Sequence, residues 1–242
     1  GLGAEYQPGS LKVGVPTLQS VSSRAGKDAD RIVLDLNRDV EIVDDVFGVP
    51  HVRAGTIPDA FFGQGYVVCE VSAAQEPALR LWQDGADGQP LRNFSNVRAT
   101  LGQGESLAFA MNAGMYHADY RPVGLLVIDG GELQPIVTGA SNDNFGMLPN
   151  GVFCTGGARP FQVIESVSFA ETRPDCRLAS QSGPMLVIDG DLHPRFLVDS
   201  DSRYVRNGVG VSPDGQTAWF AISDRAVTFH EFGRLFRDGL GV

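Results

Sequence analysis

One segment of the sequence occurs twice in related form, and this repeat constrains the fold more than any other feature. Residues 123–136 (VGLLVIDGGELQPI) resemble residues 182–196 (SGPMLVIDGDLHPRF), and each copy is typical of a strand, an Asp-Gly turn and a returning strand. Turn residues recur at 149–151 and 213–215, which predicts a second hairpin in each copy. The pattern predicts an α+β fold built from two related sheet units, mixed or antiparallel, with a few covering helices.

The two copies span about residues 107–157 and 177–223, within a domain that we expect to cover residues 66–242. Residues 1–65 are expected to form a lead-in or N-terminal appendage, because much of this stretch is rich in Gly, Ser, Lys and Asp and has little periodicity. Within it, residues 31–43 alternate like the two strands of a hairpin.

The last helix carries the clearest local signals. Thr228 and Glu231 form a T-x-x-E capping box, which explains Glu231 better as a cap than as a catalytic acid. Gly239 is expected to end the helix. Its apolar face is formed by Phe229, Phe232, Leu235 and Phe236. Such a face predicts a helix that covers a sheet.

Charge and hydropathy narrow the possible partners. The 242 residues include 19 Lys and Arg against 29 Asp and Glu, a net charge of -10, so a broad basic surface for nucleic acid or anionic membrane is not expected. No apolar run approaches the ~18 residues of a membrane span. An anionic ligand would therefore have to be met by a local arginine.

Cysteines, histidines and known motifs indicate no cofactor. Cys69, Cys154 and Cys176 allow at most one internal disulfide, and none has the spacing of a zinc site. The four histidines are widely separated, and no GxGxxG, GxxxxGK[ST], HExxH or GxSxG motif occurs. A divalent metal is left open.

Three polar clusters lie next to predicted strands. The first lies between strands predicted at residues 107–111 and 124–128, the second at the start of the second repeat copy, and the third before residue 209. Amides and hydroxyls suit sugar hydroxyls and an arginine fork suits a phosphate, although the same groups could simply satisfy local turns. The candidate residues are Asn112, Gly114, Tyr116, His117, Gln181, Ser182, Arg206 and Asn207.

Several ordered motifs resemble the phosphodiester glycosidase family, in its bacterial periplasmic branch. They are AFAMNAGMYHADYRPVGLLV, NFGMLPNGVF, LASQSGPMLVIDG, RNGVGVSPDG and the helix that follows Ile222-Ser223-Asp224. The resemblance implies a hydrolase that cleaves a sugar 1-phosphodiester in a periplasmic or secreted location. It implies that Arg206 holds the phosphate, that Ser182 and Asp224 take part in catalysis, and that Ser223 helps to line the site. We expect the polar loops to face one another, so that Asn112, Ser182 and Arg206 share one pocket.

Two alternatives remain open at this point. The resemblance implies a further Leu-Asp-Gly motif after the last helix, whereas this sequence ends at Val242, so a non-catalytic module that binds carbohydrate or envelope glycan is also expected to fit. Residues 40–67 resemble the start of penicillin-acylase-type hydrolases, which makes an N-terminal-nucleophile amidase the third hypothesis. The carboxylates near the motifs, Asp119 and Asp224, also have structural explanations.

Overall fold

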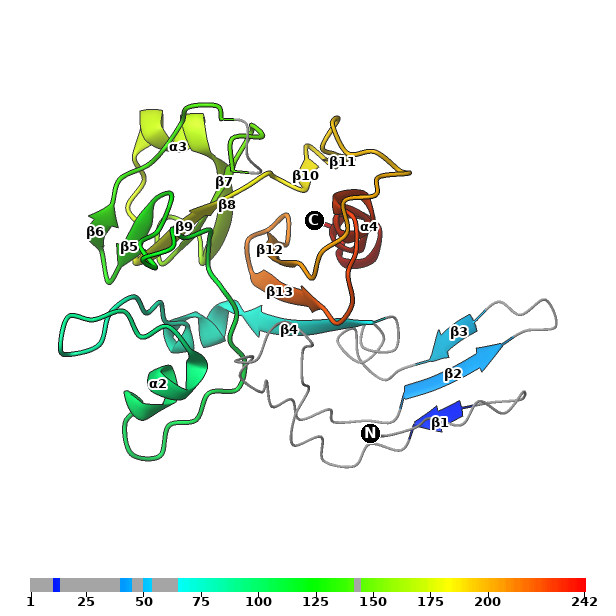
Figure 1. Cartoon of the computed structure of the whole chain (residues 1–242), viewed down its shortest axis with the longest axis horizontal. Helices are drawn as coiled ribbons and strands as arrows, with labels where there is room; N and C mark the ends of the chain where they lie inside the picture. Colours follow the sequence, from blue (N-terminus) through cyan, green and yellow to red (C-terminus); the bar gives the residue numbers. More distant parts are fainter. Residues whose placement is uncertain (1–10, 14–39, 45–49, 54–64, 142–144) are drawn as a thin grey trace.

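The structure is a computed structural model that describes residues 11–13, 40–44, 50–53, 65–141 and 145–242 (Figure 1). Helices and sheets are both present, and all strand pairs in the described residues are antiparallel. The predicted α+β class is therefore confirmed. None of the described helices is long and apolar enough to cross a membrane.

The larger sheet has five strands in the order β6-β5-β9-β7-β8. Its strands are β5 (Leu126–Ile128), β6 (Gly131–Gln134), β7 (Gly151–Thr155), β8 (Phe161–Glu165) and β9 (Leu178–Ser182). Helix α3 (Ser166–Thr172) buries Phe169 against this sheet in a core with Val152 and Ala179. Because β9 is central, the residue that ends it, Ser182, is held on a rigid element.

The second sheet has three strands in the order β12-β13-β4. They are β12 (Asn207–Val211), β13 (Thr217–Ser223) and β4 (Tyr66–Ser72), and β4 pairs with β13 from Tyr66↔Ser223 to Ser72↔Thr217. A short 3-10 helix, η1 (Ala73–Ala78), follows β4, and α2 (Phe94–Ala99) comes later in the chain. The full ladder makes β4 part of the same folded unit as the C-terminal strands.

The C-terminal helix covers this second sheet, as its apolar face predicts. The helix runs as α4 (Phe229–Arg234) and continues in a π-helical segment, η2 (Leu235–Leu240). Both halves of the predicted capping box are present, and Phe232 and Phe236 are 1% exposed. Gly241, at φ 72°, caps the end instead of Gly239, because the π-helical segment carries the helix past Gly239 to Leu240.

The two copies of the repeat form similar hairpins in different settings. Asp129 and Asp189 both have positive φ, as do the glycines that follow them, which is the backbone pattern of a tight two-residue hairpin turn. The first hairpin, β5–β6, belongs to the five-stranded sheet, whereas β10 (Val187–Ile188) and β11 (Asp191–Leu192) pair only with each other. The duplication itself stays a prediction, because unrelated folds also share such hairpins.

Three details of the sequence-based prediction need correction or fall outside the described residues. Residues 107–111 are not a strand; instead Phe109 packs on Phe220, with ring centroids 6.5 Å apart. The described residues directly before the turn at 149–151, residues 145–148, form no strand, and β7 pairs instead with β8 beyond the turn. The predicted hairpin at residues 31–43 lies mostly outside the described residues. Its described part belongs to β2 (Val40–Asp44), which pairs with β1 (Leu11–Val13) and β3 (Pro50–Arg53).

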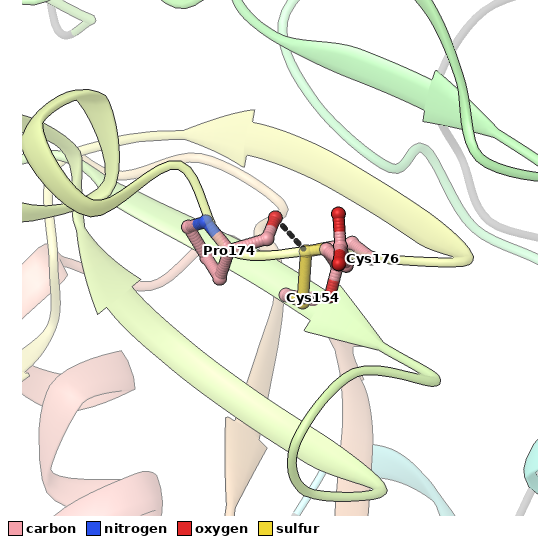
Figure 2. The surroundings of a disulfide bond; sticks show 4 residues. Cys154, Pro174 and Cys176 are labelled. Atoms are coloured by element: carbon pink, nitrogen blue, oxygen red, sulfur yellow. Dashed lines mark hydrogen bonds between the residues drawn. A yellow bond between two sulfur atoms is a disulfide. The ribbon is translucent and has the colours of Figure 1, made fainter.

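A disulfide bond ties the five-stranded sheet together. Cys154 on β7 is bonded to Cys176, just before β9, with the two Cα atoms 5.5 Å apart (Figure 2). The thiol left over is Cys69 on β4. Sequence alone allowed one bridge among three cysteines, and the structure selects the pair.

Candidate functional site

One cavity brings the three polar clusters together. Its volume is about 940 Å³, and its lining comes from residues 111–117, from residues 182–187 at and after the end of β9, and from β12. The α4 residues Phe229 and Phe232 contribute an aromatic wall. Both sheets therefore supply parts of a single hollow large enough for a small ligand.

Most of the candidate residues line this cavity. Asn112, Ser182 and Arg206, which are far apart in the sequence, meet there as the polar-loop hypothesis requires. Their roles stay predictions, because shared lining does not establish chemistry. The candidates that line the cavity are Asn112, Gly114, Tyr116, His117, Ser182, Arg206 and Asn207.

Gln181, next to Ser182 on β9, makes its hydrogen bonds inside the fold and does not line the cavity. Its side chain is 2% exposed, and Oε1 accepts hydrogen bonds from the backbone of Leu125 (3.1 Å) and Val137 (3.0 Å). Its Nε2 donates to the carbonyl of Val137. Side chains alternate along β9, so Gln181 points into the fold and Ser182 toward the cavity. Gln181 therefore joins β9 to the segments at Leu125 and Val137.

Ser223 and Asp224, at the end of β13, also lie outside the cavity lining. Ser223 is 1% exposed, and its Oγ accepts a hydrogen bond from the backbone N–H of Arg206 at 2.9 Å. Asp224 is exposed, and its backbone N–H donates to Gly65 at 3.0 Å. Ser223 thus supports Arg206 from behind, and the position of Asp224 gives no support to a role as the acid.

Arg206 is a buried cation without a carboxylate partner among the residues that the structure describes. Nε donates to the carbonyl of Val227 (2.9 Å) and Nη2 to that of Ser202 (3.1 Å). Its Cζ lies 3.6 Å from the ring centroid of Phe229 and 5.6 Å from that of Tyr204. Burial lowers the pKa of Arg206, since a low-dielectric environment disfavours the charged form, and Tyr204 partly opposes this. An arginine stays charged even so.

The loop of residues 112–117 is held against the two sheets by close contacts. Asn207 Nδ2 donates to the carbonyl of Asn112 at 2.6 Å, which joins the loop to β12. At Gly114 any Cβ would lie 2.7 Å from the backbone oxygen of Gln181, so only glycine lets the loop approach β9 this closely. Gly114 is therefore required for close packing of the loop against β9, and this packing places the loop at the cavity.

Asp189 is a cavity residue that the sequence reasoning missed. It lies at the exposed tip of the β10–β11 hairpin and is the one carboxylate among the described lining residues. The hairpin reaches the cavity because it packs against α4, where Gly233 leaves room for the side chain of Leu192. The Asp-Gly turn was visible in the sequence, but an aspartate in a tight turn has a sufficient local explanation.

The other carboxylates near the motifs have structural partners. Asp119 pairs with Arg121, whose hydrogen bonds lower the pKa of Asp119. Glu231 caps α4 and pairs with Arg203, and its backbone hydrogen bond from Thr228 lowers the pKa of Glu231 first of all. In the described part of the chain, no three His, Cys, Asp or Glu side chains gather as a metal site.

Comparisons with known proteins found matches to most of the chain. The chain is 29% identical over 158 residues to the uncharacterized protein YigE of Escherichia coli (strain K12), a match that covers 65% of this chain and 61% of that protein. A penicillin amidase family model matches residues 39–83, a segment that includes β4 of the three-stranded sheet. The phosphodiester glycosidase family model matches residues 105–242, which is more than half of the sequence and includes every cavity-lining residue named above. The chain therefore belongs to the phosphodiester glycosidase family.

Proposed function

We propose that this protein hydrolyses a sugar 1-phosphodiester. The observation that carries the proposal is Arg206, a buried guanidinium that lines the cavity and has no carboxylate partner in the described residues. An uncompensated buried charge is costly, so a ligand that neutralises it is bound with a large gain. A phosphodiester is such a ligand, and family membership supports it.

The remaining lining residues suit the sugar. Nη1 of Arg206 makes no hydrogen bond to any described residue, which leaves it for a phosphate oxygen. Asn112, Asn207 and Ser182 supply amides and a hydroxyl for sugar hydroxyls. Water would add to the anomeric carbon as its bond to the phosphate oxygen breaks, giving a free sugar and a phosphomonoester.

Proton transfer in this step falls to the titratable groups at the cavity. Asp189 and His117 both line it, and a carboxylate and an imidazole are the side chains most used as general acid and base. Neither is held by a side-chain hydrogen bond to another described residue. We propose these two residues, in place of Asp224, as the acid and base.

A second candidate function is a binding module that takes up a sugar phosphate without cleaving it. Most glycosidases place two carboxylates about 5 to 9.5 Å apart across the bond. Only Asp189 lines the described part of this cavity as a carboxylate, which favours this alternative. We also propose a periplasmic or secreted location, supported by the disulfide between Cys154 and Cys176, since such bonds persist in oxidising compartments.

The test is release of 4-nitrophenol from a 4-nitrophenyl phosphodiester of a sugar 1-phosphate, coupled to a phosphomonoesterase. Arg206→Gln removes the charge at similar size and should lower kcat/KM about 10- to 150-fold, the value of one charged hydrogen bond. Arg80→Gln is the matched control, because Arg80 is an exposed arginine paired with Glu105 outside the cavity. Asp189→Asn should lower kcat with little effect on KM.

Each result separates the candidates. Equal rates in Arg206→Gln and Arg80→Gln would remove the basis of the proposal. Calorimetric binding of the sugar phosphodiester without release, lost in Arg206→Gln, would establish the binding module instead. Two fragments on a denaturing gel, produced by self-cleavage, would point to the amidase.

A further inference from the structure

A stacked pair of tyrosines lies at the edge of the cavity. Tyr116 lines the cavity and is 53% exposed, and Tyr120 is 37% exposed. The two rings are nearly parallel, with centroids 5.9 Å apart and an interplanar angle of 10°. Arg92 lies over the ring of Tyr120, with Cζ 5.5 Å from the centroid. The cavity mouth thus carries a flat aromatic surface that the fold leaves accessible.

The loop that carries this pair is held in one conformation. The N–H of His117 donates to Arg121 and that of Tyr120 donates to His117, each at 2.8 Å, and Gln83 Nε2 donates to the carbonyl of Tyr120 at 2.8 Å. Tyr120 has φ +69°, a left-handed conformation that costs a non-glycine residue about 1–2 kcal/mol. A strained residue fixed by several hydrogen bonds makes a preorganised loop.

Packing within the fold does not account for Tyr116. Tyr120 covers one face of its ring, and among the described residues no other aromatic ring or cation contacts it. More than half of the residue stays exposed, so burial of this ring contributes little to stability. Its accessible surface borders the same cavity as Arg206.

We propose that Tyr116, backed by Tyr120, is a stacking subsite for a sugar ring of an oligosaccharide. A pyranose offers a flat face of C–H groups to an aromatic ring and hydroxyls at its edge, and a tyrosine ring has the matching apolar face and polar tip. The polar neighbours His117 and the exposed Asp119–Arg121 pair suit those hydroxyls. The inference rests on the proposed function: the phosphate-linked sugar occupies the cavity near Arg206, and a further sugar of the same glycan stacks on Tyr116.

The experiment separates the subsite from the phosphate site. Binding of neutral maltotriose, cellotriose and chitotriose is measured by calorimetry and by saturation-transfer NMR. Wild-type protein should bind at least one of them, and Tyr116→Ala should bind it about three- to tenfold more weakly. Tyr116→Phe, which keeps the ring and loses only the hydroxyl, should bind it more tightly than Tyr116→Ala. Arg206→Gln should keep the neutral ligand, since no charge is involved. Leu133→Ala, an exposed apolar residue on β6, is the surface control.

A kinetic comparison gives the second readout. Tyr116→Ala should raise KM for a phosphodiester reporter on a trisaccharide about three- to tenfold more than it raises KM for a monosaccharide reporter, with the same effect on kcat for both. Tyr116→Leu repeats the test with apolar bulk retained, should the alanine variant unfold. The inference is wrong if wild type binds none of the three neutral sugars, or if both reporters respond equally. Either result would leave Arg206-dependent hydrolysis of the reporter intact, so the proposed function is judged separately.

Discussion

Removal of the disulfide is expected to cost a large share of the stability of this fold. Cys154 and Cys176 are 22 positions apart, and the closed loop contains β8 and α3. The chain-entropy relation for a loop of this length gives about 3.4 kcal/mol at 25 °C. Because a typical domain is stable by only about 5–15 kcal/mol, loss of the bridge should move the unfolding transition well outside experimental error.

Urea unfolding followed by far-UV circular dichroism measures this cost. The variant with both Cys154→Ala and Cys176→Ala is compared with wild type in the presence and absence of a thiol reductant. Cys69→Ala is the control, since Cys69 forms no disulfide and reductant should not change its difference from wild type. A difference below about 1 kcal/mol between reduced and oxidised wild type would refute the assigned bridge or its entropic account.

Three further predictions concern the site and the last helix. Gly114→Ala should cost about 1–3 kcal/mol in urea unfolding and lower reporter hydrolysis, because its Cβ would press on a backbone oxygen of β9. Gly139→Ala should change neither, since its Cβ would meet no atom of the described residues within 4 Å. Phe229→Leu should raise KM for the phosphodiester about two- to thirtyfold, since it removes the ring that faces Arg206, and should lower Tm slightly, since the same ring stacks on Phe196. Glu231→Gln should lower Tm at about pH 7, and the difference from wild type should shrink as the solution is acidified, because the lowered pKa of Glu231 gives stability above its ordinary value of 4.5 that is lost as pH falls through the folded pKa.

Locally encoded elements were the predictable part of this fold. The Asp-Gly turns and the capping box of α4 follow from short patterns in which turn residues and caps agree. The pairing of β4 with β13 could not be predicted, since the partners are about 150 positions apart and no local pattern selects one strand edge over another. The strand predicted at residues 107–111 is wrong for the same reason, because an apolar run becomes a strand only where a partner strand is available to pair with it.

The site residues could be predicted where residue type and position on a strand determine whether a side chain faces the cavity. Ser182 is the last residue of β9 and Arg206 directly precedes β12, and both reach the cavity. Gln181 was assigned with Ser182, but side chains alternate along β9 and its amide meets buried backbone groups instead. Asp189 was missed because a hairpin far along the chain brings it to the cavity, an arrangement fixed by packing against α4.

The environment of Arg206 bears on whether the ligand of this cavity is a phosphorylated sugar or a neutral one. The chain has ten more acidic than basic groups, so a carboxylate partner for a structural arginine would be easy to supply, as Arg203 and Arg177 illustrate. Arg206 is instead oriented by two backbone carbonyls and the face of Phe229, none of which neutralises its charge. A module for neutral sugars would keep this buried cation at a free-energy cost with no return from the ligand. An anion that enters the cavity removes that cost, so the charge at this position favours a phosphorylated sugar over a neutral one, whether or not the bond is then cleaved.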